Sequence, residues 1–214
     1  MNKPTAIVTG ISRGLGQAIA AALTGAGWTV IGDGRSLTAQ RRGHVPGDVT
    51  DSWHRGLLVE TALETGRLDL LVNNAGILGP SPQPFLADYP DAELRRVFEV
   101  NVVAPLALTQ LALPALRDHG GAVVNISSDA ATGAYPGWGG YGAAKAAVEQ
   151  LSNVLAAEEP KLRVWCVDPG DLRTRMHQEA FPGQDISDRP RPESVMPAFL
   201  ALLAERPASG RVKL

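Results

Sequence analysis

Two side chains capable of proton transfer, Tyr141 and Lys145, lie four positions apart in a stretch rich in glycine and alanine. A helix that begins near Tyr141 would place them on the same face, one turn apart. An ammonium group beside a phenol favours the phenolate and lowers its pKa from the usual value of about 10. The pair is therefore a candidate acid–base group acting on an alcohol or carbonyl oxygen. Many Tyr and Lys pairs with this spacing are only structural, so the rest of the chain has to support the interpretation.

The N-terminal region contains the elements of an anion-binding site. Residues 5–9 form an apolar run typical of a buried strand, and residues 17–23 have the composition of a helix. Between them, Gly10, Gly14 and Gly16 would let a pyrophosphate approach the backbone, and the first N–H groups of the helix would point at it. Some glycine turns with this spacing are purely structural.

Short apolar runs alternate with helical patterns along the whole chain. The runs expected to form strands are residues 5–9, 28–32, 44–46, 68–72, 121–126, 162–167 and 210–214. This alternation predicts an α/β fold, a single Rossmann-like domain over residues 1–214 with one doubly wound, mainly parallel sheet and helices on both faces. Ligand loops would then gather at the carboxyl ends of the strands.

Ser128 follows one of these strands and lies thirteen positions before Tyr141. With this serine, the glycine turn and the Tyr and Lys pair, the sequence resembles the short-chain dehydrogenase/reductase family over nearly its whole length. The resemblance implies a catalytic set of Asn101, Ser128, Tyr141 and Lys145. In that set the tyrosine exchanges the proton and the lysine holds the nicotinamide ribose and lowers the tyrosine pKa. The serine polarises the substrate oxygen, and the asparagine positions a water next to the lysine.

The resemblance also implies a dinucleotide site built from the loops that follow five strands. Asp48 would accept from the adenine amino group, and Pro169 would lie near the nicotinamide ring. The implied cofactor-binding residues are Gly10, Ser12, Arg13, Gly14, Leu15, Gly16, Arg35, Asp48, Val49, Asn74, Ala75, Gly76, Tyr141, Lys145, Pro169, Gly170 and Thr174.

The exit of the second strand selects between the two nicotinamide dinucleotides. An acid at this point holds the ribose 2′-hydroxyl of NAD, whereas an arginine accommodates the 2′-phosphate of NADP. The discriminating acid aligns with Gly34, and Arg35 and Arg13 supply two cations, so NADP(H) is favoured. A shift of one residue would make Asp33 the acid and leave NAD(H) possible.

Other positions leave alternatives open. Asn101 interrupts the apolar face of a long helix over residues 91–116, where it could equally satisfy a neighbouring carbonyl. Pro105 is expected to bend this helix or interrupt one of its turns. Trp138 is a candidate wall of the substrate pocket, although core or interface packing would also explain it. Residues 175–192 are expected to form a short substrate lid.

Composition limits the classes of partner. The chain has 214 residues, 44% hydrophobic and 20% charged, with a net charge of −2, which provides no basis for binding nucleic acid or an anionic membrane. The single cysteine, Cys166, lies in an apolar run and is expected to be buried, and the histidines lack metal-ligand spacing, so no metal site is expected. No signal peptide or membrane-spanning run is recognised, and a cytoplasmic homodimer or homotetramer is expected.

The sequence therefore predicts an NAD(P)(H)-dependent oxidoreductase that interconverts a small carbonyl compound and a secondary alcohol. Two other classes remain open. One is a cofactor-binding sensor or interaction protein without turnover, and the other is a nicotinamide-dependent epimerase or dehydratase.

Overall fold

The apolar runs of the chain form the strands of one parallel sheet in the computed structural model, which describes residues 3–36 and 43–214. The seven strands are hydrogen-bonded in the order β3-β2-β1-β4-β5-β6-β7. Their bounds are β1 Thr5–Val8, β2 Thr29–Gly34, β3 His44–Pro46, β4 Leu70–Asn73, β5 Ala122–Ile126, β6 Arg163–Asp168 and β7 Gly210–Lys213. The α/β class and the parallel sheet predicted from the sequence are confirmed.

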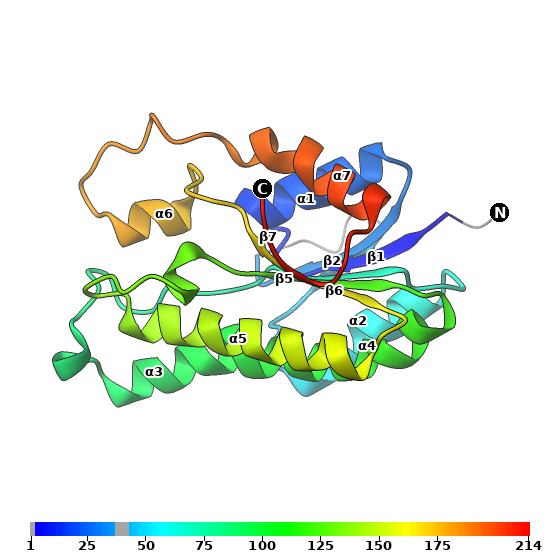
Figure 1. Cartoon of the computed structure of the whole chain (residues 1–214), viewed down its shortest axis with the longest axis horizontal. Helices are drawn as coiled ribbons and strands as arrows, with labels where there is room; N and C mark the ends of the chain where they lie inside the picture. Colours follow the sequence, from blue (N-terminus) through cyan, green and yellow to red (C-terminus); the bar gives the residue numbers. More distant parts are fainter. Residues whose placement is uncertain (1–2, 37–42) are drawn as a thin grey trace.

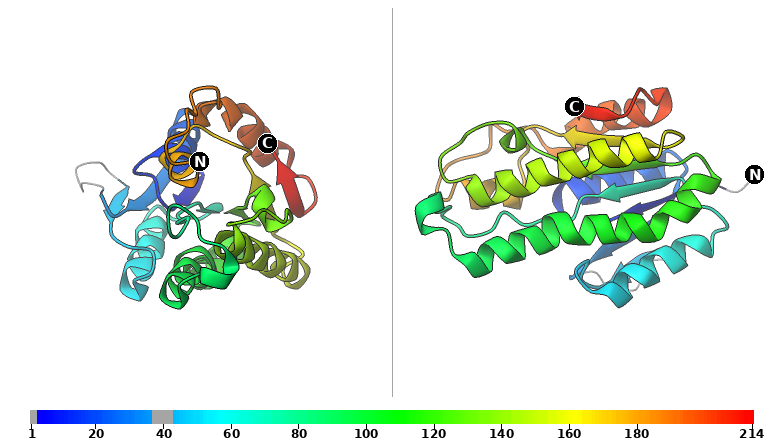
Figure 2. Two further views of the ribbon diagram at one scale, coloured as in Figure 1. Left: turned by 90° about the vertical axis from the view of Figure 1, so that its left-hand side faces the viewer. Right: turned by 60° about the horizontal axis from the view of Figure 1, so that its bottom comes forward.

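Helices cover both faces of this sheet (Figure 1). They are α1 Gly14–Gly25, α2 Ser52–Leu63, α3 Asp91–Phe98, α4 Ala104–Asp118, α5 Gly139–Glu158, α6 Arg175–Ala180 and α7 Met196–Glu205. Short 3₁₀ turns occur at η1 Leu86–Asp88, η3 Asp129–Ala131 and η4 Pro192–Val195, and η2 Glu99–Val103 is a π-helical turn. Helices α1 and α7 lie on one face, and α2, α4 and α5 on the other, where Figure 2 shows α4 and α5 side by side.

The core consists of two apolar layers, one on each face of the sheet. On the first face Ile19 and Phe199, from α1 and α7, pack against strand residues such as Val72. On the second face Leu58 of α2 and Leu108 of α4 are fully buried and pack against strand residues such as Leu71. Strands covered on both faces must be apolar throughout, which explains why these segments lack the alternation of a half-exposed strand.

The strand order places the functional loops at one edge. The chain moves outward from β1 to β2 and β3, then returns to the other side of β1 with β4. A crevice forms at the carboxyl ends of the strands where the order reverses, and ligands of open α/β sheets bind there. In Figure 1 this edge lies on the left, where the chain passes from β5 to α5.

Two segments differ from the sequence expectation. Strand β2 continues to Gly34, beyond the predicted residues 28–32, because β3 pairs with its last residues, with Asp33 opposite Val45. Helix α6 forms inside the expected lid, because Thr174 caps it by accepting a hydrogen bond from the His177 N–H. The sequence leaves only a short segment rich in arginine and glycine between Arg35 and His44, too short for the helix that the family resemblance implies there, and residues 37–42 of it lie outside the described residues.

The helical segment 91–118 is continuous apart from the π-helical turn. Pro105 has no N–H to donate to the carbonyl four residues earlier, and its ring would clash with that carbonyl in an α-helix, so the widened turn before it follows from the sequence. This segment alone among the described helices has the length and hydropathy of a membrane span. Its apolar residues Val97, Leu108 and Leu116 are fully buried in the fold, which explains that hydropathy.

Candidate active site

A cleft of about 620 Å³ opens at the carboxyl ends of the strands. Eighteen of the predicted site residues line it. They are Gly10, Ser12, Arg13, Gly14, Leu15, Gly16, Arg35, Asp48, Val49, Asn74, Ala75, Gly76, Ser128, Tyr141, Lys145, Pro169, Gly170 and Thr174. The remaining predicted residue, Asn101, does not line the cleft.

The glycine turn between β1 and α1 forms one wall of the cleft. Gly10 has φ +72°, a conformation that side chains disfavour, and a Cβ there would lie 3.0 Å from the Ala75 Cα. A Cβ on Gly16 would overlap the carbonyl oxygen of Gly10, so only glycine allows α1 to pack against the turn. The side-chain amide of Asn74 donates to the Thr9 carbonyl at 2.8 Å and braces the same turn. The start of α1, at Gly14, thus presents its N–H groups to the cleft, an arrangement suited to a pyrophosphate.

The carboxylate of Asp33 stabilises the glycine turn by a hydrogen bond to its backbone. Its Oδ1 accepts a hydrogen bond from the Gly10 N–H at 2.6 Å, and its Oδ2 lies 3.2 Å from Nε2 of His54. The Asp33 and His54 side chains are almost fully buried. Both oxygens of this carboxylate therefore have partners inside the fold, which leaves it poorly suited to hold a ribose hydroxyl.

Two guanidinium groups border the same end of the cleft. Arg13 is the residue before α1, and Arg35 directly follows β2. Asp48, in the loop after β3, accepts two hydrogen bonds on Oδ1 from Thr50, and the N–H group is 3.0 Å away. Burial raises the pKa of Asp48, but these hydrogen bonds and the charge of Arg35 outweigh it and keep the pKa below its usual value.

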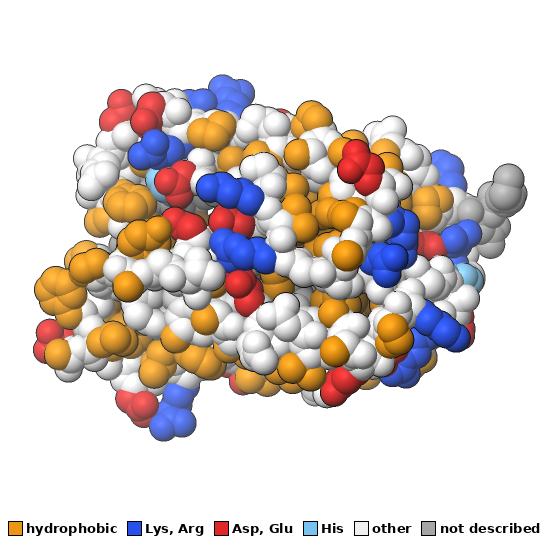
Figure 3. Space-filling model, in the orientation of Figure 1, with side chains coloured by type: hydrophobic (Ala, Val, Ile, Leu, Met, Phe, Trp, Pro, Cys, Tyr) orange, Lys and Arg blue, Asp and Glu red, His pale blue; other side chains and the backbone are white. Residues whose placement is uncertain are grey.

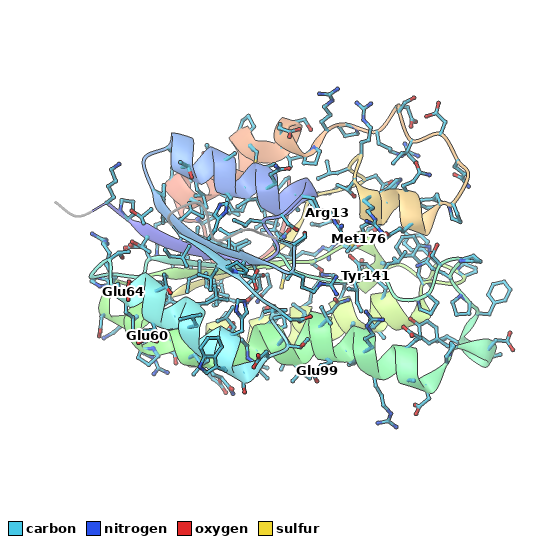
Figure 4. All side chains as sticks on the ribbon, turned by 180° about the vertical axis from the view of Figure 1, so that it is seen from behind. Arg13, Glu60, Glu64, Glu99, Tyr141 and Met176 are labelled. Carbon is cyan, nitrogen blue, oxygen red and sulfur yellow. The ribbon has the colours of Figure 1, made fainter. Side chains whose placement is uncertain are left out.

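Tyr141 and Lys145 lie in the first two turns of α5, both buried and both lining the cleft. The Lys145 Nζ donates to the Ile126 carbonyl at 2.7 Å and lies 5.4 Å from the centroid of the Tyr141 ring. The Tyr141 hydroxyl lies 4.0 Å from the Met176 sulfur (Figure 4). The predicted juxtaposition on one helical face is therefore present.

The predicted effect of the lysine on the tyrosine is wrong for this structure. Burial, with the carboxylates of Asp129 and Asp168, raises the pKa of Tyr141 well above its usual value. Burial lowers the pKa of Lys145 to about 8. The reason is geometric, because the ammonium is turned to a backbone carbonyl and the face of the ring, not to the phenol oxygen.

Ser128 lies at the end of β5, on the cleft wall with Tyr141. Its hydroxyl donates to Oδ1 of Asp129 at 2.9 Å and accepts from the Ala130 N–H at 3.2 Å, so it caps the turn η3. The neighbouring Ser127 donates to Glu149. A substrate oxygen would have to take the place of Asp129 as the acceptor of the Ser128 proton.

Asn101 lies in the π-helical turn, 2% exposed. Its side chain accepts from the Ile77 N–H at 2.9 Å and donates to the Ile77 carbonyl at 2.8 Å. This is the structural alternative considered for Asn101, and it fixes the segment after Gly76. Both ends of the side-chain amide thus have backbone partners, so a water beside Lys145 would have to be held by another group of Asn101.

The loop after β6 completes the cleft. Gly170, with φ +70°, donates its N–H to Oδ1 of Asp168 at 3.0 Å. Thr174 approaches the glycine turn, since a Cβ on Gly14 would lie 3.6 Å from its methyl group. Asp171 lies 3.9 Å from His177 and is mostly exposed. Trp138, at the start of α5, lines the cleft as expected for a pocket wall.

Arg211 on β7, which the sequence analysis missed, bonds groups from three other elements around the cleft. It donates to Oδ2 of Asp168 at 2.8 Å and to the Ser128 carbonyl at 3.3 Å, and it pairs with Glu149. Its partners lie 43 to 83 positions away in the sequence. The sequence shows Arg211 only as a cation in a terminal strand. Its partners cannot be identified until the order of the strands in the sheet is known.

We expect Arg211→Met to lower the free energy of unfolding by ~2 kcal/mol, because Asp168 and Glu149 would lose their cation while remaining mostly buried. Urea denaturation at neutral pH measures this loss. Lys213→Met removes a cation two residues along the same strand, from an exposed position, and serves as the control. Equal stabilities of the two variants would contradict the assignment.

Buried Cys166 has its pKa raised to about 11, mainly by burial, as expected for a strand residue and not a nucleophile. Within residues 3–36 and 43–214, no cluster of three or more His, Cys, Asp or Glu side chains could hold a metal ion.

The sheet order, the glycine turn at its switch point and the buried Tyr and Lys pair together define a nicotinamide dinucleotide-binding oxidoreductase fold. The model of the short chain dehydrogenase family matches residues 4–185. The chain is 33% identical to the uncharacterized oxidoreductase YciK of Escherichia coli, over 96% of this chain and 88% of that protein. This protein belongs to the short-chain dehydrogenase/reductase family and is an NAD(P)-dependent oxidoreductase.

Solved structures agree with this membership. A short chain dehydrogenase of Shigella flexneri complexed with NADP superposes with a TM-score of 0.89 at 30% identity, covering 100% of this chain and 97% of that one. An alcohol dehydrogenase of the archaeon Thermococcus sibiricus, complexed with 5-hydroxy-NADP, gives a TM-score of 0.86 at 26% identity, with coverages of 99% and 96%.

Proposed function

We propose that this protein reduces a small ketone or aldehyde to an alcohol, with NADPH as the hydride donor, by a reaction that is reversible. The observation that carries the proposal is the buried pair of Tyr141 and Lys145, which lines the same cleft as the phosphate-binding turn. The dinucleotide supplies the hydride, and the chain supplies position, a proton and exclusion of water.

Tyr141 is suited to act as the acid in this reaction. The phenol is protonated at neutral pH, so it can donate to a carbonyl oxygen as negative charge builds there. The carbonyl carbon accepts the hydride, and the oxygen takes the Tyr141 proton to become the alcohol. Lys145, with a pKa of about 8, is near enough to neutrality to return a proton to the tyrosine.

Ser128 and Asn101 have supporting roles in the proposal. The Ser128 hydroxyl would turn from Asp129 to the substrate oxygen and stabilise its charge. Asn101 would act as a positioning residue, and its backbone carbonyl is the group to hold a water beside Lys145. Pro105 supports this role. In an α-helix the residue at position 105 would donate its N–H to the Asn101 carbonyl, and a proline has no N–H to donate.

The test is a panel of ketones and aldehydes with the purified protein, following NADPH absorbance and identifying the product. Loss of NADPH matched by formation of the corresponding alcohol supports the reductase. Tight NADPH binding without turnover of any compound would point instead to a cofactor-binding sensor, and an isomerised product without net NADPH loss would point to an epimerase.

We also propose that NADPH is preferred over NADH. Arg13 and Arg35 border the end of the cleft where the 2′-phosphate would lie, and both oxygens of Asp33 are already bonded inside the fold. The second point weakens the argument for NAD, because the Asp33 carboxylate is almost fully buried and already bonded to Gly10 and His54.

Replacing Arg35 with serine should raise the KM for NADPH by roughly 10- to 100-fold, the value of one charge-assisted contact to phosphate, and leave the KM for NADH nearly unchanged. Steady-state kinetics with both cofactors measure the difference. Arg95→Ser, which removes an exposed arginine of α3, is the control. Equal losses for the two cofactors would show that Arg35 does not contact the 2′-phosphate.

A homodimer or homotetramer formed through α4 and α5 also remains a proposal. Three exposed side chains on these neighbouring helices support it by adding apolar surface, namely Leu106, Leu111 and Val154, and exposed Val103 lies directly before α4. Analytical ultracentrifugation tests it.

A further inference from the structure

The space in front of the Tyr141 hydroxyl is walled by aromatic, thioether and aliphatic groups. Tyr141 packs in one cluster with side chains from three separate loops or helices, namely Leu78, Ala130, Trp138, Met176 and Ala180. The indole of Trp138 meets the Tyr141 ring edge-on, with centroids 5.9 Å apart and planes at 71°. The Phe181 ring lies next to the indole, with the two ring centroids 6.0 Å apart.

The position of Met176 shows which part of this space a substrate would take. Its sulfur lies 4.0 Å from the phenol oxygen that must reach the substrate carbonyl, and its side chain is attached to the short helix α6. A methionine side chain is flexible and adapts to neighbouring groups, so a substrate can displace it. The group that replaces the thioether would then pack against the indole of Trp138. A flat aromatic ring suits that contact best.

The charges around this end of the cleft are mostly negative. Asp129, Asp171 and Glu179 line it, and Arg175 is paired with Glu179 at 2.7 Å. Asp168 is neutralised by Arg211. Asp129 accepts only from the hydroxyls of Ser128 and Tyr135 and has no cationic partner among the described residues.

The remaining charged groups do not reverse this balance. Glu93, Arg96 and Glu99 border the cleft from α3 and the π-helical turn and sum to one negative charge, which the ammonium of Lys145 beside Tyr141 offsets. His177 lies beside Asp171. Figure 3 shows acidic side chains next to a histidine in the region of α6, with basic side chains beside them. Burial is the main cause of the raised pKa of Tyr141, and the carboxylate of Asp129 adds to it.

We propose that the substrate is a ketone or aldehyde with an aromatic ring next to the carbonyl and no negative charge. This inference rests on the proposed reductase function. The ring takes the place of the Met176 side chain against Trp138, and the carbonyl oxygen meets Tyr141. A carboxylate or phosphate on the ring would approach the carboxylate of Asp129, which has no cationic partner among the described residues, and the two negative charges would repel.

The test compares four ketones with the purified protein and NADPH. Acetophenone is the neutral aromatic compound, 4-acetylbenzoate its anionic analogue, 4-(aminomethyl)acetophenone its cationic analogue, and cyclohexyl methyl ketone a saturated compound of similar size. We expect kcat/KM for acetophenone and the cationic analogue to exceed that for 4-acetylbenzoate at least tenfold. Acetophenone should also exceed the saturated ketone.

Substitutions of Asp129 and Trp138 test whether these two residues cause the differences in kcat/KM. Asp129→Asn should raise kcat/KM for 4-acetylbenzoate several-fold relative to acetophenone, whereas Asp118→Asn, at the far end of α4, should change neither. Trp138→Ala should remove the advantage of acetophenone over the saturated ketone, with NADPH binding retained as the check on folding.

The outcomes separate the two levels of the proposal. Equal or better turnover of 4-acetylbenzoate or of the saturated ketone would overturn the substrate assignment and leave the reductase function intact. No NADPH loss with any of these compounds or with the wider carbonyl panel would overturn the reductase function itself.

Discussion

Replacing Tyr141 with phenylalanine should lower kcat by roughly 10²- to 10⁴-fold, the usual contribution of a positioned general acid. The change removes one oxygen from a ring that is otherwise held by Trp138 and by the apolar cluster around it. Packing of α5 and the dinucleotide site should therefore persist. Steady-state kinetics give the loss in kcat, and fluorescence titration with NADPH should give a dissociation constant close to that of the unmodified protein.

A second tyrosine provides the matched control. The hydroxyl of Tyr89 is buried without a hydrogen-bond partner in the described part of the chain, and it does not line the cleft. Tyr89→Phe should leave kcat unchanged and should not lower stability, because no hydrogen bond is lost. Full activity in Tyr141→Phe would remove the phenol from the mechanism.

Replacing Lys145 with methionine should abolish most turnover and yet stabilise the protein without nucleotide at neutral pH. Burial lowers the pKa of Lys145 from 10.5 to about 8. At about 1.4 kcal/mol per unit, this shift corresponds to a cost of about 3 kcal/mol for holding the ammonium in the fold. The lost hydrogen bond to the Ile126 carbonyl offsets about 1 kcal/mol of that. Below pH 8 the variant should therefore be more stable by about 2 kcal/mol.

The sign of the pH dependence follows from proton binding. Between pH 8 and 10.5 the unfolded chain holds its Lys145 proton while the folded protein releases it, so the stability of the unmodified protein rises with pH over this range. The advantage of Lys145→Met should shrink accordingly and disappear by about pH 10.5. Urea denaturation of both proteins across this range measures the difference.

Lys161→Met is the control, because Lys161 is exposed and the stability difference should stay small and independent of pH. A Lys145→Met protein that is less stable at pH 7, with no change in the difference up to pH 10.5, would contradict the buried-ammonium account. A residue retained at such a cost is expected where activity and stability compete.

Local signals in the sequence were sufficient for most of the fold. The apolar runs, the glycine turn before α1 and the acid before α2 are short-range patterns, and each has a local physical effect. Asp51, for example, caps α2 by accepting from the Trp53 N–H. Pro105 predicted an interrupted turn in the same way, because a missing N–H acts on the residue four positions before it.

Electrostatics was the part of the site that such patterns did not predict. The spacing of Tyr141 and Lys145 determined that they share a face of α5, but not where the ammonium points. The Ile126 carbonyl, from a strand 19 positions earlier, takes that ammonium. The burial that shifts both pKa values comes from several elements packed together, so it has no counterpart in the local sequence.

The sequence by itself determined the fold class and the dinucleotide turn, because these depend on residue types at short spacing, and its resemblance to the family indicated most of the site residues that line the cleft. Only the tertiary structure decided that Asp33 is bonded to Gly10 and His54, that Asn101 is bonded to Ile77, and that Arg211 neutralises Asp168. These contacts join residues 21 to 43 positions apart. Charge and hydrogen-bond partners depend on which distant groups the sheet order brings into contact, and that order follows from the packing of all the strands and helices together.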